Sequence, residues 1–84
     1  MFESVDNKII KMISEVVDYR ADLITKDKFL DADLMMDDSA RSDLRDDLEN
    51  EYFFEIDENE FEECHTVQDI INIVYKSLDT QTGS

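Results

Sequence analysis

The side chains that could act as nucleophiles or bases are few and unsuitably spaced for catalysis. The sequence contains one cysteine and one histidine, Cys64 and His65, and the two are adjacent. Nucleophilic catalysis needs a nucleophile, a base and an orienting group in contact, whereas adjacent residues on a helix do not face each other. We therefore expect Cys64 to fill a core position and His65 to lie at the surface or near a helix cap. We predict no catalytic residues and no enzymatic activity.

Carboxylates are the other side chains that could perform chemistry. Asp37 and Asp38 could mimic the acid–base pair of a hydrolase, but no aromatic or polar substrate-binding residues lie beside them. The run from Asp31 contains Asp33 but lacks the glycine and the closing glutamate of a calcium loop. A glycine-rich phosphate loop is also absent from the sequence. We therefore predict no dedicated metal site and interpret Asp37 and Asp38 as the beginning of a helix.

The charge is strongly negative and unevenly distributed. The chain has 23 acidic and 8 basic residues, which give a net charge of −15. Between Asp31 and Glu63, 15 acidic residues accompany only Arg41 and Arg45, so this segment carries −13. Nucleic acids and anionic membranes repel such a chain. We expect partner proteins with basic patches, and neither nucleic acid nor a membrane as a partner.

The size and composition indicate one helical domain. The chain has 84 residues, no proline and a single glycine, Gly83, which disfavours hairpin-rich folds. The single cysteine excludes a disulfide within this sequence, and we expect neither a secretory signal nor a membrane-spanning segment. We expect residues 1–84 to form a single all-α domain that is monomeric and located in the reducing cytoplasm.

The spacing of apolar residues predicts three main helices and one short helix. The first covers about residues 2–18, and the second begins at Asp37, Asp38 and Ser39 and ends at residue 52 or 53. The short helix covers residues 57–63. The last helix begins at Thr66, which forms a shortened capping box with Asp69, and residues 79–84 are expected to fray.

These helices need apolar faces to form a core. The second helix repeats apolar residues every fourth position, at Ala40, Leu44, Leu48 and Tyr52. We expect the connection over residues 19–36 to pack through Ile24, Phe29, Leu30 and Leu34, and the chain after the second helix to turn inward at Phe53, Phe54 and Ile56. Phe61 anchors the short helix, and the last helix is predicted to bury Val67, Ile70, Ile71, Val74, Tyr75 and Leu78.

The region around the second helix resembles the acyl carrier protein family. That family's motif reads roughly D-L-G-x-D-S-L-D, followed by V/I-E-L and L-E-x-x-F. The matching residues are Asp33-Leu34, Asp37, Asp43-Leu44, and Leu48-Glu49 with Tyr52. The register extends upstream through Ile24-Thr25 and Leu30 and downstream through Glu55-Ile56 and Thr66-Val67-Gln68, so about fifty residues are covered. The resemblance implies a small antiparallel four-helix bundle of acyl-carrier type.

The sequence departs from the family at the position that carries its cofactor. The family attaches 4'-phosphopantetheine to a serine, and that serine aligns with Asp38. Ser39, one residue later, is the only candidate for attachment, and Met35 replaces the family's glycine. A helix turns roughly 100° per residue, so we expect Ser39 to point toward the position where the family buries leucine.

The resemblance implies two alternative functions. A working carrier would hold acyl groups on a phosphopantetheine arm for fatty acid or polyketide biosynthesis. A homologue without the arm would act as a binding or regulatory module. Both would dock to enzymes that recognise carrier proteins through Asp37, Asp38, Asp43, Asp46, Asp47, Glu49 and Glu51. A weaker alternative, based on charge alone, is an acidic mimic of nucleic acid that inhibits a DNA-binding protein.

Overall fold

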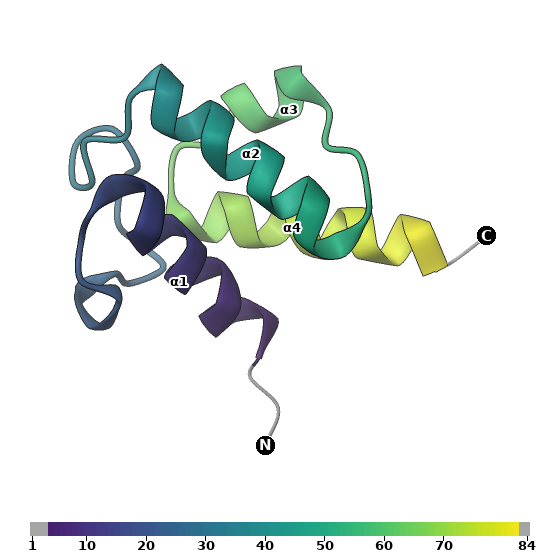
Figure 1. The fold of residues 1–84 in the computed structure, drawn as a ribbon, viewed down its shortest axis with the longest axis horizontal. Helices are drawn as coiled ribbons and strands as arrows, with labels where there is room; N and C mark the ends of the chain where they lie inside the picture. Colours follow the sequence, from purple (N-terminus) through teal and green to yellow (C-terminus); the bar gives the residue numbers. More distant parts are fainter. Residues whose placement is uncertain (1–3, 83–84) are drawn as a thin grey trace.

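The structure is a computed structural model that describes residues 4–82. This part of the chain forms four α-helices and one 3-10 turn and contains no β-strand, which confirms the all-α prediction of three main helices and one short helix (Figure 1). α1 packs against α2 and α4, and α3 packs against α4. The elements are α1 (Val5–Val17), η1 (Ala21–Leu23), α2 (Asp38–Tyr52), α3 (Glu58–Glu62) and α4 (Val67–Thr82).

Each α-helix begins where a side-chain oxygen accepts a hydrogen bond from a free backbone N–H of the first turn. Ser4 accepts from the amide of Asn7, Asp37 from that of Ala40 at 2.8 Å, and Asp57 from that of Glu60. Thr66 Oγ1 accepts from the Asp69 amide, while the Asp69 carboxylate accepts from the Thr66 amide, each at 3.2 Å. The predicted beginning of the second helix at Asp37 and the predicted capping box are therefore confirmed.

One hydrophobic core joins the helices and the long connection before α2. Leu44 and Leu48 are fully buried, and Ala40 and Tyr52 pack half-buried against the same cluster, as the four-residue spacing predicted. From the connection, Ile24, Leu30 and Leu34 are buried as predicted, and so is Met36, which was not. α1 contributes Ile9 and Ile13, α3 contributes Phe61, and α4 contributes Val67, Ile70, Ile71, Ile73 and Val74.

Three aromatic residues that were expected inside lie outside. Phe29 is 52% exposed because its neighbour Leu30 enters the core and successive side chains of an extended segment point to opposite sides. Phe53 is 83% exposed, because the chain reverses there through a left-handed residue with φ of 56°. Tyr75 is exposed and donates a 2.6 Å hydrogen bond from its hydroxyl to Asp6 on α1.

The ends of the helices differ partly from the prediction. α1 begins at Val5, and Phe2 lies outside the described residues. α4 extends to Thr82, and residues 83–84 of the tail that is expected to fray lie outside the described residues. No helix within residues 4–82 is long and apolar enough to cross a membrane.

The connection between α1 and α2 is fastened to the beginning of α4. Phe29 and Thr66 form an isolated antiparallel bridge, in which the Leu30 amide donates to the His65 carbonyl at 2.8 Å. The amides of Val67 and Gln68 donate to the carbonyls of Lys28 and Lys26 at 3.1 and 2.9 Å. These two amides belong to the first turn of α4, where no carbonyl of the helix itself can accept. The connection therefore caps α4 and is held in place before it reaches α2.

Candidate docking surface on α2

The two arginines of the acidic segment point away from its outer surface. Arg41 Nη1 donates to the carbonyl oxygens of Phe61 and Cys64 at 3.0 and 3.1 Å, and only 12% of the Arg41 side chain is exposed. Arg45 Nη1 lies 3.5 Å from the Ile56 carbonyl oxygen. Carbonyls at the C-terminal end of a helix attract cations, so Arg41 suits the end of α3. Both guanidinium groups thus join α2 to the chain around α3.

The sequence reasoning did not predict this role of the arginines. Arg41 and Arg45 each lie three residues before a fully buried leucine, Leu44 and Leu48. Residues three apart on a helix share a face, so this spacing already indicated that both arginines border the core.

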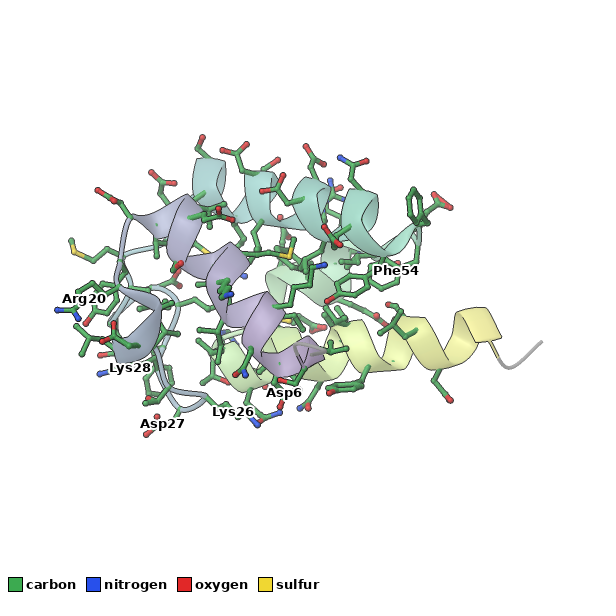
Figure 2. All side chains as sticks on the ribbon, turned by 60° about the horizontal axis from the view of Figure 1, so that its bottom comes forward. Asp6, Arg20, Lys26, Asp27, Lys28 and Phe54 are labelled. Atoms are coloured by element: carbon green, nitrogen blue, oxygen red, sulfur yellow. The ribbon has the colours of Figure 1, made fainter. Side chains whose placement is uncertain are left out.

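The outer face of α2 is left with carboxylates and uncharged polar groups. Asp38, Asp43, Asp46 and Asp47 are exposed, and so are the remaining residues on this side, Ser39, Ser42 and Asn50. Figure 2 shows oxygen-tipped side chains projecting from the side of α2 that faces away from the rest of the molecule. Asp43 and Asp47 are four residues apart and therefore repel each other. The outer face of α2 (residues 38, 39, 42, 43, 46, 47 and 50) is a continuous negative surface.

Three of the predicted docking residues also have contacts within the fold. Asp37 caps α2, as described above. Glu49 Oε2 accepts a hydrogen bond from the Ile56 amide at 2.8 Å and is half-buried. Glu51 forms an ion pair with Lys8 of α1 at 2.5 Å. The structure therefore brings Asp38, Asp43, Asp46 and Asp47 together on the outer face, with Asp37, Glu49 and Glu51 at its borders.

The predicted orientation of Ser39 is wrong. Ser39 is exposed rather than directed toward the core. It precedes the buried Leu44 by five positions, which rotates it about 140° away from that leucine around the helix. Ala40 and Arg41, four and three positions before Leu44, occupy the inward side instead. Asp38 and Ser39 consequently both face solvent in the first turn of α2.

The chain before this turn has an unusual backbone. Met35 has φ of 53° and its side chain is 84% exposed. A left-handed backbone is disfavoured for a residue with a Cβ atom and is the conformation that glycine adopts most readily. Met36, the next residue, is buried, and its amide donates to the Leu30 carbonyl at 2.9 Å. The left-handed residue therefore lets the chain place Met36 in the core and begin α2 two residues later.

A small cleft lies between the first half of α2 and α3. Its volume is about 240 Å³, and its lining includes Asp38, Arg41, Arg45 and Phe61. Both arginines already bind backbone carbonyls, and Phe61 is 2% exposed. Asp38 of α2 and Phe61 of α3 therefore border the same cleft.

Cys64 and His65 do not form a reactive pair. Cys64 is buried, and its thiol lies 3.6 Å from the Glu60 carbonyl oxygen. Burial, reinforced by the nearby charge of Asp69, raises the pKa of the Cys64 thiol to about 11. His65 is exposed, and its backbone amide donates to the Asp69 carboxylate. The predictions of a core cysteine and a surface histidine beside a cap are confirmed. Within residues 4–82, no group of three or more His, Cys, Asp or Glu side chains is arranged to hold a metal ion.

Three basic residues lie on the connection before α2, among acidic residues such as Asp27. Figure 2 labels Arg20, Lys26 and Lys28 on the connection before α2, away from the acidic side of that helix. Lys26 lies 2.6 Å from the Asp6 carboxylate, and this contact, together with the Tyr75 hydroxyl, lowers the pKa of Asp6 below its ordinary value of 3.8. The acidic residues of the connection are thus accompanied by basic ones, whereas the outer face of α2 has none.

Comparison with known proteins adds no family assignment. The sequence matches no protein-family model, and no curated protein matches it.

Proposed function

We propose that this chain is an acyl-carrier-like, non-enzymatic protein that docks to basic patches on carrier-recognising enzymes through the outer face of α2. The single observation that carries the proposal is the inward orientation of Arg41 and Arg45, which leaves that face without a cation. A surface of one sign attracts a partner of opposite sign over long distances and speeds encounter.

The carrier-like character is supported by local geometry at the positions of the resemblance. Met35 stands where that family has glycine, and it adopts the left-handed backbone that glycine favours. Asp37 stands at the family's acid before the serine, and it caps α2. At Met35 and Asp37, a backbone conformation and a side-chain cap are thus compatible with the resemblance.

Docking is tested with a promiscuous phosphopantetheinyl transferase as the partner, because such an enzyme recognises carrier proteins. Association rates are measured by surface plasmon resonance across a salt series. We expect Asp43→Lys and Asp47→Lys to slow association and to flatten its salt dependence. The matched control is Asp79→Lys, an equal charge reversal on α4. Equal effects of all three substitutions would show that the outer face of α2 is not the interface.

The same enzyme distinguishes a homologue without the arm from a working carrier. We favour the homologue without the arm, because a transferase must align the hydroxyl with the phosphate of coenzyme A, and Ser39 is rotated by roughly 100° from the family position at Asp38. The exposure of Ser39 keeps the working carrier, with 4'-phosphopantetheine on Ser39, as the second candidate.

The test is incubation with the transferase and coenzyme A, followed by measurement of intact mass. We expect little or no mass gain for the wild type and for Ser39→Ala, and a gain of one phosphopantetheine for Asp38→Ser. Full modification of the wild type, abolished by Ser39→Ala, would instead make the protein a working carrier. The mass measurement tests Ser39, and the salt series tests the outer face of α2. A negative result in one experiment therefore leaves the other experiment interpretable.

A further inference from the structure

A groove lies where the C-terminal end of α2 meets residues 54–57, α3 and α4. Its volume is about 920 Å³, and Phe53 and Phe54 both line it. The ring of Phe54 stacks on that of Tyr52 with centroids 5.7 Å apart and is 7% exposed, so its position is fixed. Figure 2 places Phe54 below the end of α2, on the side that faces α4. The groove therefore has an ordered aromatic floor.

Phe53 is unfavourable for the fold on two counts. It is the C-cap residue of α2 with φ of 56°, a conformation for which glycine or asparagine is preferred. Its ring is 83% exposed, so folding recovers little of the gain that burial of a phenylalanine normally provides. Met35 has a similar backbone and exposure, but Phe53 differs from it in lining a groove beside a second aromatic residue, Phe54, and this position supports a role in binding.

The remaining lining residues of the groove are mainly acidic, with the uncharged Asn50 and Ser77 beside them. Glu49, Glu55, Asp57 and Glu60 line it, and Lys76 is the only basic residue among the lining residues. Lys76 Nζ lies 2.9 Å from Glu60, and this carboxylate raises the pKa of Lys76 above its ordinary value. The lining therefore has more negative than positive charge around its aromatic residues. A second copy of the chain, also at −15, would be repelled, and so would an anionic lipid surface.

We propose that this groove binds a basic amphipathic segment of a partner protein. An apolar side chain of the segment would pack on Phe53, and its lysine or arginine side chains would pair with Glu55 and the neighbouring carboxylates. This site lies at the end of α2 and shares only Asn50 with the outer face of that helix. Asp43 and Asp47, which carry the docking proposal, are absent from its lining.

The probe is a short, fluorescently labelled amphipathic peptide of leucine and lysine, and binding is measured by anisotropy with the full chain. Phe53→Gly removes the ring and places glycine at a left-handed position, so its melting temperature should equal or exceed that of the wild type. Met35→Gly is the matched control, because Met35 is also left-handed and 84% exposed but lies before α2, outside the groove.

We expect Phe53→Gly to weaken binding of the peptide about tenfold, the change typical of losing one aromatic anchor. Met35→Gly should bind like the wild type, and a peptide with serine in place of leucine but equal charge should bind weakly to all three proteins. Equal binding by Phe53→Gly and the wild type would overturn the proposal, as would equal losses in the two glycine variants. Concentration-dependent dimerisation of the wild type that Phe53→Gly abolishes would also overturn it, because the occupant would then be a second copy.

Discussion

Asp69 stabilises the beginning of α4 through its ionised carboxylate. Its Oδ2 accepts hydrogen bonds from the amides of His65 at 2.9 Å and Thr66 at 3.2 Å. These bonds, led by that from His65, lower the pKa of Asp69 below its ordinary value of 3.8. Because the folded-state pKa is the lower one, the contribution of Asp69 to stability is complete above 3.8 and disappears as the pH falls through the folded-state pKa.

Asp69→Asn should therefore lower the free energy of unfolding at neutral pH by about 1 kcal/mol, since a charged acceptor of two amides is replaced by a neutral one. The difference from the wild type should shrink as the pH falls below 3.8. Urea unfolding at a series of pH values measures it, with Asp22→Asn as an exposed control on the surface. A difference that stays constant down to strongly acidic pH would contradict this role.

Cys64 should react slowly with alkylating reagents. The reactive form is the thiolate, and burial raises the pKa of the thiol from 9.0 to about 11. We expect modification by iodoacetamide at mildly alkaline pH to be much slower in the native protein than in urea, as followed by mass spectrometry. A short synthetic peptide spanning residues 60–68 provides the rate for an accessible thiol. Similar rates in the native and the unfolded protein would show that the core around α3 opens readily.

At the scale of elements, Arg41 holds α2 to the chain around α3. Arg41→Ala removes two charge-assisted hydrogen bonds and leaves the carbonyls of Phe61 and Cys64 without this donor, so the loss should be about 2–3 kcal/mol of unfolding free energy. Arg20→Ala is the matched control, because it removes the same charge from a side chain that is 75% exposed and pairs with Asp22. We expect it to change stability by less than about 0.5 kcal/mol.

Chemical denaturation of both variants at one ionic strength measures the difference. Equal losses of unfolding free energy in Arg41→Ala and Arg20→Ala would mean that the change in net charge, and not the contacts of Arg41, causes the loss.

The helices could be predicted from the sequence because local rules determine them. The four-residue spacing of Leu44 and Leu48 and the polar residues at Asp37 and Thr66 indicated both the inner faces and the starting points. The wrong prediction for Tyr75, in contrast, depends on a contact distant in sequence. Tyr75 has the spacing of a core residue, but Asp6 provides a partner for its hydroxyl at the surface.

The candidate docking surface could be predicted only in part, because side-chain orientations depend on the folded chain. Counting charges revealed an acidic segment, but charge counts do not show which side chains turn inward. The roles of Arg41 and Glu49 depend on backbone groups of residues 56–64, which approach α2 only in the folded chain. The left-handed backbone of Phe53 likewise has no signal in the sequence, because phenylalanine is not a residue that such a position prefers.

At the scale of the whole molecule, repulsion among carboxylates should limit stability. A net charge of −15 on 84 residues opposes the compact state, and added ions screen that repulsion. We expect the melting temperature to rise with sodium chloride and to rise more at equal ionic strength with magnesium chloride. Asp43→Asn with Asp47→Asn should reduce the salt dependence, because this pair repels across one turn of α2. A melting temperature that is flat or falls with salt would contradict this expectation.

The hydrogen bonds from the first turn of α4 to the connection before α2 imply that the amides of this turn exchange when the connection separates from α4. The amides of Val67 and Gln68 are bonded to Lys28 and Lys26, about forty residues earlier in the chain, rather than within their own helix. Hydrogen exchange at these two amides should therefore report the detachment of the connection and not the unwinding of α4. Lys26→Ala, which removes the ion pair with Asp6, should speed exchange at Gln68 while leaving amides in the middle of α4 protected. We therefore expect hydrogen exchange in the first turn of α4 to follow the motion of the connection before α2.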